Sequence, residues 1–208
     1  MITGILLACQ PGEAWSLRVW FARHGETDWN AARRIQGSRD IPLNAAGRAQ
    51  AETLAETVAA LAPALTRVYT SPLCRALETA QCVAGRLGCP CTVLPGLREI
   101  DFGDWEGKTW AEAEAANPAA YARFCQNRRT ERPPHGESCQ DALDRLLPAL
   151  RQALAAQTGD VLFLTHSALL KALLCLVEET SFSAISTEYT LLNGAAMELP
   201  REKILRKL

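Results

Sequence analysis

Three segments place histidine or arginine side chains just after apolar runs that are typical of β-strands. They are Arg23 and His24 after residues 17–22, Arg75 after residues 67–70, and His166 after residues 161–165. Guanidinium groups form paired hydrogen bonds with phosphate oxygens, and imidazole nitrogens add further polar contacts. If the runs are neighbouring parallel strands, these side chains meet at one edge of a sheet, where helix N-termini add free N–H donors. The residue types therefore predict a pocket for a phosphate dianion.

The chain around these segments alternates between strand-like and helix-like patterns, which indicates an α/β fold with a largely parallel sheet. Strands are expected at 17–22, 67–70, 91–94, 161–165, 188–192 and 195–199. Helices are expected at 45–61 after an Asn44 cap, from Ser71 and Pro72 to a stop at Gly88, from Ser138 to about 154, and at 167–177. Ligands of such sheets bind beyond the carboxyl ends of the strands, where the candidate phosphate-binding residues lie.

Composition and charge exclude several classes of protein. The 208 residues hold 22 Lys and Arg against 23 Asp and Glu, a balance that argues against general binding to nucleic acid or to membrane surfaces. No apolar run reaches the ~18 residues of a membrane span. The eight cysteines include no C-x-x-C pair, so we expect reduced thiols in a cytoplasmic protein without a metal site. One incidental disulfide involving Cys89 or Cys91 is the alternative.

We expect a single domain over residues 17–208. Residues 1–16 contain no Lys or Arg of the kind that begins a secretory signal, and they are expected to be a short N-terminal extension. Residues 104–137 interrupt the alternation with four aromatic side chains and a basic, proline-rich loop. This segment is expected to be a helical cap inserted into the domain.

Four motifs, in this order, resemble the histidine phosphatase superfamily, in the branch that includes cofactor-dependent phosphoglycerate mutases. They are Arg23-His24-Gly25-Glu26-Thr27-x-x-Asn30, with Gln36, Gly37 and Gly47 after it; Ser71-Pro72-x-x-Arg75; Leu97-Arg98-Glu99; and Thr165-His166. A lone R-H-G triplet is a weak signal, but four ordered blocks are specific. The resemblance covers residues 17–199. It implies a phosphoglycerate mutase-like fold, a three-layer αβα sandwich with a mostly parallel, mixed central sheet.

The resemblance also implies roles for individual residues. His24 would be the nucleophile and carry a phosphohistidine intermediate, which requires a neutral imidazole with one free ring nitrogen. Arg23, Arg75 and His166 would bind the phosphoryl oxygens and stabilise their charge in the transition state. Asn30 would bind the same oxygens as a substrate ligand.

Glu99 would protonate the leaving alkoxide and then activate water, and the resemblance implies neither a cofactor nor a metal ion. Asp101 and Glu106 lie close by in the sequence as alternative acids, but Glu99 is the position that matches the family motif. Gln36 and the backbone N–H of Ser167 are further candidates for contact with the substrate.

Two positions depart from the family pattern. Ser167-Ala168 follows the last histidine where members usually have two glycines, and Lys171 stands where they often have arginine. Both changes bear on the fit of the substrate and not on the class of reaction. In the cap, His135 lies in a loop that the family places near the site. A basic group there forms a solvated face or binds a substrate anion; its members are Arg123, Arg128, Arg129 and Arg132.

The leading interpretation is a hydrolase that acts on a small phosphorylated metabolite. The alternative is a phosphoglycerate mutase with the same phosphohistidine, but mutases of this family typically have a longer insert than the 66 residues at 100–165, one that excludes water. The 99–107 run looks most like α-ribazole phosphatases, which act late in cobalamin assembly, and broad-specificity sugar phosphatases. A non-catalytic binding module for a phosphorylated partner is the third interpretation. Many relatives are dimers, so a homodimer is an open expectation.

Overall fold

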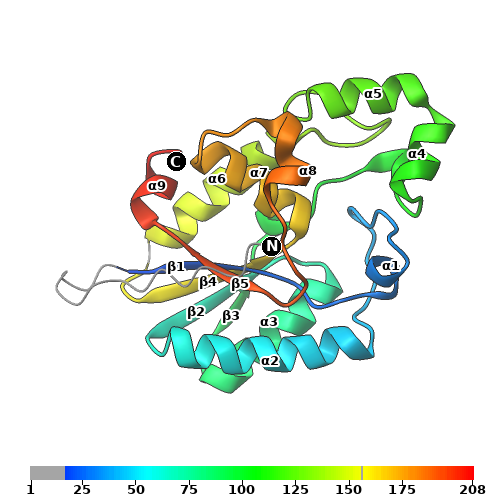
Figure 1. The fold of residues 1–208 in the computed structure, drawn as a ribbon. Helices are drawn as coiled ribbons and strands as arrows, with labels where there is room; N and C mark the ends of the chain where they lie inside the picture. The colour runs from blue at the N-terminus through cyan, green and yellow to red at the C-terminus, as the bar shows by residue number, and fades with distance from the viewer. Residues whose placement is uncertain (1–16, 156) are drawn as a thin grey trace.

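The computed structural model describes residues 17–155 and 157–208, and the expected extension over residues 1–16 lies outside this range. A five-stranded sheet runs through the described part of the chain (Figure 1). Its strands are β1 (Val19–Arg23), β2 (Leu65–Thr70), β3 (Cys91–Val93), β4 (Asp160–Thr165) and β5 (Ala196–Leu199). The order is β3-β2-β4-β1-β5, and the strands are parallel except β5, which pairs antiparallel with β1. The expected mostly parallel, mixed sheet is therefore confirmed.

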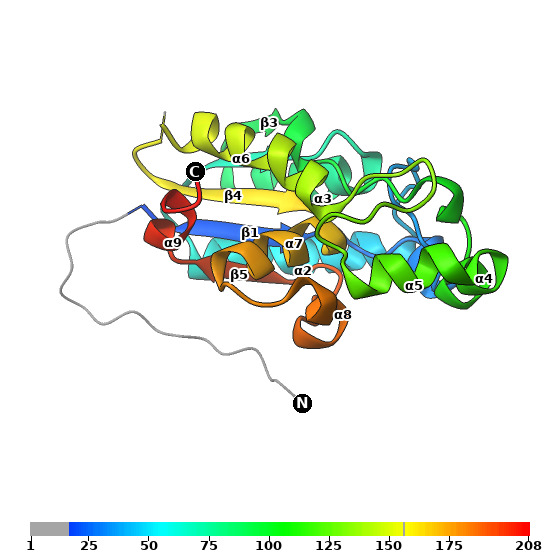
Figure 2. The same cartoon turned by 90° about the horizontal axis from the view of Figure 1, so that it is seen from above.

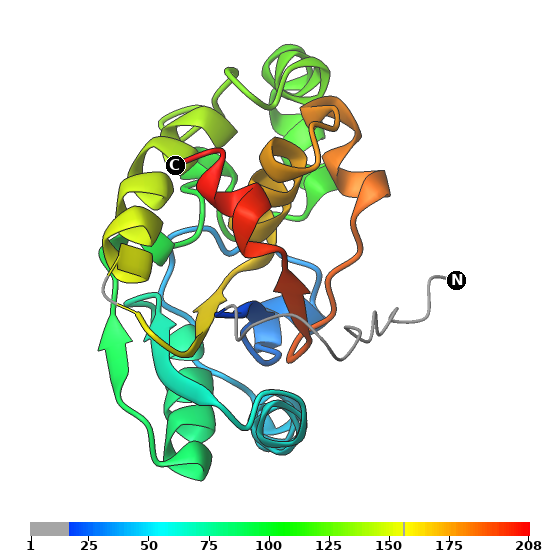
Figure 3. The same cartoon turned by 90° about the vertical axis from the view of Figure 1, so that its left-hand side faces the viewer.

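Helices cover both faces of the sheet, as the end-on view in Figure 3 shows. The α-helices are α1 (Asp28–Ala31), α2 (Ala45–Leu61), α3 (Cys74–Leu87), α4 (Trp110–Ala116), α5 (Pro118–Gln126), α6 (Cys139–Ala155), α7 (Ser167–Val177), α8 (Ile185–Glu188) and α9 (Arg201–Leu205). Short 3-10 turns are η1 (Pro95–Leu97), η2 (Gly103–Trp105) and η3 (Phe182–Ala184). One layer is built by α2 and α3, and the opposite layer by α6, α7 and α9.

Alternating side chains of the central strands serve two separate cores. In β1, Phe21 faces the core under α6 and α7, while Ala22 faces the core against α2 and α3. In β4, Phe163 and Leu164 divide in the same way. Successive residues of a strand point to opposite faces, so a strand buried on both sides is apolar throughout. This accounts for the continuous apolar run at 161–165.

The helices flanking the candidate site begin as expected in two cases and differ in one. The bounds expected for α2 and α7 are confirmed, and Asn44 caps α2 with its side-chain oxygen 2.8 Å from the N–H of Gly47. The expected start of α3 at Ser71 was wrong, because the helix begins at Cys74. Ser71 still continues the sheet, since its N–H donates to the carbonyl of Leu164 at 3.1 Å.

The strand expected at 188–192 was also wrong. Residues 190–193 form an irregular segment between α8 and β5. Its polar groups contact the end of β1 and the residue after it: the carbonyl of Leu191 accepts from Arg23, and the side chain of Asn193 donates to the carbonyl of His24. This segment therefore lies against the end of β1.

Residues 104–137 contain α4, α5 and the connecting loops, beyond the carboxyl ends of the strands (Figure 2). Aromatic side chains hold this cap together: the rings of Trp105 and Phe124 meet edge to face at 5.1 Å, and Trp110 stacks on Phe124 at 6.5 Å. The cap thus presents an aromatic surface toward the strand ends.

Within residues 17–155 and 157–208, none of the helices has the length and apolar character needed to cross a membrane. All seven cysteines in that part of the chain are free, Cys89 and Cys91 included, while Cys9 falls outside it. The same residues contain no group of three or more His, Cys, Asp or Glu side chains placed to hold a metal ion.

Candidate active site

Two buried histidines lie side by side at the carboxyl ends of the two central strands. His24 follows β1 and His166 follows β4, and the parallel register that pairs Arg23 with Thr165 brings them level. Their ring centroids are 5.1 Å apart. Both side chains are inaccessible, with exposures of 3% for His24 and 0% for His166. The parallel sheet therefore supplies the pairing that the sequence predicted.

His24 is held as a neutral imidazole of defined tautomer. Its Nδ1 lies 2.6 Å from the carbonyl oxygen of Gly25, which can only accept, so Nδ1 carries the proton. Its Nε2 accepts a hydrogen bond from Nε of Arg75 at 3.3 Å, which assigns the lone pair to Nε2. Burial, and then the charges of Arg75 and Arg23, hold the pKa of His24 well below its usual value. The ring is thus set up as a nucleophile at Nε2.

The backbone crossing at Gly25 and Gly47 fixes where His24 lies. A Cβ on Gly25 would lie 2.2 Å from the carbonyl oxygen of Gly47, and a Cβ on Gly47 would lie 2.0 Å from that of Glu26. Only glycine allows two backbones to approach this closely. The N–H of Gly25 also donates to the hydroxyl of Thr79 at 3.1 Å. The first turn of α2 therefore presses directly against the loop that carries the histidine.

His166 is oriented by Ser71. The Nε2 atom of His166 lies 2.7 Å from Oγ of Ser71, and Oγ also accepts from the N–H of Leu73. With the Ser71 hydroxyl as the donor to Nε2, which is the one ring nitrogen acceptor it meets among the described residues, the proton of His166 is assigned to Nδ1. Nδ1 is buried without a hydrogen-bond partner in the described part of the chain. Burial, and then the charge of Arg75, lowers the pKa of His166 well below its usual value.

Two arginines frame the histidines. Arg75 is 1% exposed and donates from Nη1 to the carbonyl of Arg39 at 2.6 Å and from Nη2 to the carbonyl of Gly37 at 2.9 Å. Arg23 donates from Nη1 to the carbonyl of Leu191 at 2.6 Å, and its Nε is buried with no partner among the described residues. Burial lowers the pKa of both arginines, and the Glu99 carboxylate opposes that shift. Both side chains are therefore fixed by carbonyl oxygens near the histidines.

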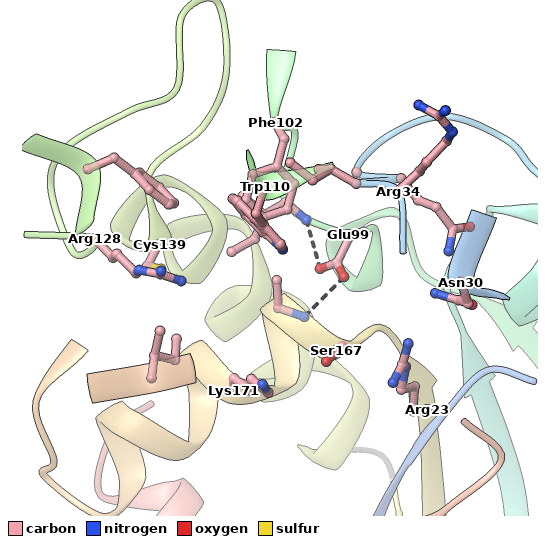
Figure 4. Close-up of a pocket in the computed structure, with 17 residues that line it drawn as sticks. Arg23, Asn30, Arg34, Glu99, Phe102, Trp110, Arg128, Cys139, Ser167 and Lys171 are labelled. Atoms are coloured by element: carbon pink, nitrogen blue, oxygen red, sulfur yellow. Dashed lines mark hydrogen bonds between the residues drawn. The ribbon is translucent and has the colours of Figure 1, made fainter. Parts of the chain in front are cut away.

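Asn30 is oriented by the side chain of Asn193. Its Oδ1 accepts from the backbone N–H of Thr27 at 3.2 Å and from Nδ2 of Asn193 at 3.1 Å. The same Nδ2 of Asn193 donates to the carbonyl of His24 at 3.1 Å. These contacts use the oxygen of Asn30 and leave its amide N–H groups to face the cavity, as Figure 4 shows.

Glu99 lies at the N-terminus of α7, on the cavity side of His166. Its Oε1 accepts from the N–H of Leu169 at 2.8 Å and of Ile100 at 3.0 Å, and its Oε2 accepts from the N–H of Ala168 at 3.0 Å. The side chain is 7% exposed and is the one carboxylate among the described residues that line the cavity. These three N–H donors fix the orientation of the carboxylate beside the cavity.

These groups adjoin a cavity of about 380 Å³ under the cap. Five of the eight site residues predicted from the sequence line it (Figure 4), namely Arg23, Asn30, Gln36, Glu99 and Ser167. His24, Arg75 and His166 are not among the lining residues, but Arg75 donates to the carbonyl of Gly37 in the cavity wall and to Nε2 of His24. The Oε1 atom of Gln36 is buried without a partner in the described residues, as are atoms of Arg23 and His166. Unsatisfied buried groups clustered beside one cavity suit a polar ligand.

The competing acids lie elsewhere. Glu106 accepts from the backbone of Ser38 at 2.6 Å and pairs with Arg39 at 3.1 Å, and Asp101 accepts from the N–H of Gly103 at 2.8 Å. Both carboxylates are used to fix loops, and neither lines the cavity.

Most of the cap's basic residues also face away from the cavity. Arg132 pairs with Asp141 at 2.6 Å and Arg123 with Glu131 at 3.8 Å. The imidazole of His135 is 84% exposed and contacts Asp104 at 3.1 Å. Arg128 is the member of this group that lines the cavity.

The sequence did not predict the contacts that three residues make near the site: Ser71, Asn193 and Arg145. Ser71 was assigned to a helix cap, and Asn193-Gly194 had only the signature of a turn. Arg145 in α6 donates to the carbonyls of Gly96, Arg98 and Glu99 at 2.7 to 2.9 Å, and so holds the backbone that carries Glu99. On a helix, Arg145 gave no signal that separates it from any exposed arginine.

We compared the chain with protein-family models, with known proteins and with solved structures. The family model described as "Histidine phosphatase superfamily (branch 1)" matches residues 19–200. The chain is 40% identical over 155 residues to phosphoglycerate mutase-like protein 4 of Arabidopsis thaliana, covering 73% of this chain and 66% of that protein. It is 38% identical over 165 residues to glucosyl-3-phosphoglycerate phosphatase of Mycolicibacterium vanbaalenii, covering 75% and 72%. The solved structure of Bacillus stearothermophilus YhfR matches with a TM-score of 0.80 at 34% identity, covering 89% of this chain and 91% of that one.

Proposed function

This chain belongs to branch 1 of the histidine phosphatase superfamily, and from that premise we propose that it hydrolyses a small phosphomonoester through a phosphohistidine on Nε2 of His24. The observation that carries the proposal is the tautomer of His24, with Nδ1–H on the carbonyl of Gly25 and the lone pair of Nε2 beside Arg75. A neutral, oriented imidazole flanked by two guanidinium groups suits attack on a phosphorus atom.

The phosphoryl group would bind between Arg23, Arg75, Asn30 and Nδ1–H of His166. Arg75 donates to Nε2 of His24 in the ligand-free site, and turning that N–H toward a phosphoryl oxygen would free the lone pair. Fixed donors of this kind stabilise the charge on the transferring group without reorganisation during the reaction. Nε2 then bonds to phosphorus as the bond from phosphorus to the leaving oxygen breaks.

Glu99 would move the protons. The N–H groups of Ala168 and Leu169 hold its carboxylate at the cavity wall, within reach of a leaving group bound there. Protonated Glu99 gives its proton to the leaving alkoxide. The resulting carboxylate takes a proton from the water that attacks the phosphohistidine, which returns His24 and releases inorganic phosphate.

Transfer of the phosphoryl group to water, not back to a sugar acid, is part of the proposal. Its support is the short segment between Glu99 and His166, with a cap of two helices, α4 and α5. α-Ribazole 5'-phosphate is a substrate to test, because the aromatic surface of the cap suits a flat ring. Phosphoglycerate mutase activity is the second candidate, since one relative at 40% identity carries a mutase-like name.

The test measures phosphate release from a panel of phosphomonoesters in EDTA, with wild-type protein and His24→Ala. The panel includes 3-phosphoglycerate and α-ribazole 5'-phosphate, and acid-sensitive, base-stable phosphate on the trapped protein reports a phosphohistidine. Hydrolysis that His24→Ala abolishes, with a phosphohistidine in the wild type, is the expected result. Conversion of 3- to 2-phosphoglycerate after bisphosphoglycerate priming, with no phosphate release, would replace the hydrolase by a mutase. If the protein binds a phosphomonoester but neither hydrolyses nor isomerises any of them, the remaining interpretation is a non-catalytic binding module.

A further inference from the structure

The cavity continues past Glu99, away from Arg23 and Asn30, to a second group of polar residues (Figure 4). Lys171 reaches it from α7 and Arg128 from the loop after α5, and Trp110 and Phe124 form its apolar wall. The guanidinium of Arg128 lies 5.1 Å from the ring centre of Phe124 and 5.8 Å from that of Trp110, so the aromatic rings fix its position. This end of the cavity is thus built from two elements on opposite sides.

The two cations at this end have no anionic partner in the described part of the chain. Lys171 is half-buried and makes no hydrogen bond or ion pair there, and Nε of Arg128 is buried without a partner. Arg34 differs, because it also lines the cavity but donates to the carbonyl of Gly107 at 2.6 Å and pairs with Glu112 at 3.4 Å. Partly buried cations are normally paired, so the pair at Lys171 and Arg128 calls for a ligand.

The electrostatics point the same way. Burial, followed by the charges of Arg23 and Arg128, lowers the pKa of Lys171, which means that like charges face one another across the cavity. Four cationic side chains and one carboxylate line this space. A negative group on the ligand would offset the like charges of Lys171 and Arg128.

We propose that Lys171 and Arg128 form a subsite for a carboxylate on the leaving group, so that the preferred substrates are phosphorylated carboxylic acids. The inference rests on the proposed function, because it takes the phosphoryl group to lie at His24. The ammonium of Lys171 and the guanidinium of Arg128, whose Nη2 contacts Sγ of Cys125 at 3.7 Å but no anion in the described residues, match the two oxygens of a carboxylate. The aromatic wall beside Arg128 excludes water from that contact and strengthens it.

The test compares substrates that differ only in the charged group. Glycerol 3-phosphate has a hydroxymethyl group where 3-phosphoglycerate has its carboxylate, and phosphoethanolamine has a hydrogen where phosphoserine has its carboxylate. Charge-assisted contacts of this kind are expected to raise kcat/KM by about tenfold or more for the acids. Equal rates within each pair, or faster turnover of an uncharged aromatic ester such as α-ribazole 5'-phosphate, would overturn the subsite.

Variants then assign the effect to Lys171. Lys171→Met should reduce the preference for the acid to less than about threefold, mainly through KM, while Lys171→Arg keeps the charge and the preference. Arg34→Met is the matched control, since it removes a cation from the same cavity that already has a partner, and it should leave the preference intact. A full preference in Lys171→Met would refute the assignment.

Failure of the subsite and failure of the proposed function can be separated by binding. In His24→Ala, titration calorimetry with 3-phosphoglycerate and with glycerol 3-phosphate measures the carboxylate contact without turnover. If the wild type hydrolyses nothing but His24→Ala binds the acid about tenfold more tightly, the hydrolase proposal fails and the subsite stands. If the wild type hydrolyses phosphomonoesters but His24→Ala binds both ligands with equal affinity, the hydrolase proposal stands and the subsite fails.

Discussion

The hydroxyl of Ser71 is expected to matter for catalysis, although Ser71 does not line the cavity. It lies 2.7 Å from Nε2 of His166, and both side chains are 0% exposed. Ser71→Ala leaves Nε2 without a partner, and an unsatisfied buried polar group costs about 1–3 kcal/mol of folding free energy. It also removes the donor that places the proton of His166 on Nδ1. Loss of a hydrogen bond to a charged phosphoryl oxygen, about 1.5–3 kcal/mol, corresponds to a 10- to 150-fold lower kcat/KM.

The assay pairs urea unfolding with steady-state kinetics on the best substrate. Thr70→Val is the matched control, because Thr70 is a buried neighbour whose hydroxyl, within the described part of the chain, donates to the carbonyl of Ser71 at 3.3 Å and to no catalytic residue. Ser71→Ala should lose both stability and kcat/KM, whereas Thr70→Val should lose at most stability. The ¹⁵N shifts of His166 should report Nδ1–H in the wild type and a mixture in Ser71→Ala. An unchanged kcat/KM and an unchanged tautomer would refute the positioning role.

Three further predictions follow from the same geometry. Glu99→Gln should slow hydrolysis of alkyl phosphates by about 10²- to 10⁴-fold. The leaving group of 4-nitrophenyl phosphate needs no acid, so the same variant should release a burst of one nitrophenolate per enzyme from that substrate. Equal slowing of both substrates without a burst would contradict the acid role. Gly47→Ala should lower the free energy of unfolding by about 1–3 kcal/mol, since its Cβ would lie 2.0 Å from the carbonyl oxygen of Glu26. Gly85→Ala is the control, because its Cβ would meet nothing within 4 Å. Equal urea midpoints for the two variants would show that the close approach of the Gly25 and Gly47 backbones does not constrain the fold. Because the pKa of His24 and of His166 is lowered from 6.5, the folded protein binds fewer protons than the unfolded chain, so stability should be constant above that pH and fall as the pH drops below it, by up to about 1.4 kcal/mol per pH unit per histidine. His24→Ala should remove one histidine's share of that slope in urea titrations at a series of pH values, and an unaltered slope would show that His24 is not the group responsible.

The errors in the sequence analysis share a cause. The run at 188–192 has the composition of a strand, but the carbonyl of Leu191 accepts from Arg23, and Asn193 next to the run donates to the carbonyl of His24, contacts that no local pattern encodes. The start of α3 was misplaced for the same reason, because Ser71 continues the hydrogen bonding of β2 to Leu164. In both places a contact with a distant residue outweighed the local preference.

The sequence alone was enough to predict the helices and strands that depend on nearby residues, and the site residues that lie in the four family motifs. The apolar run of β4, the cap of α2 and the stop at Gly88 follow from side-chain periodicity and from backbone preferences within a few residues. The positions of His24, Arg75 and His166 after strands were enough to predict one phosphate-binding edge, since parallel strands bring their carboxyl ends together.

Only the tertiary structure decided how those side chains are oriented and what the rest of the cavity holds. The tautomer of His166 depends on Ser71, which lies 95 residues away in sequence, and the backbone of Glu99 depends on Arg145 in α6. Likewise, one arginine of the cap's basic group, Arg128, reaches the cavity and meets Lys171 there. Hydrogen bonds and ion pairs form between atoms that are close in space. For residues far apart in the sequence, that distance is set only when the helices pack on the sheet.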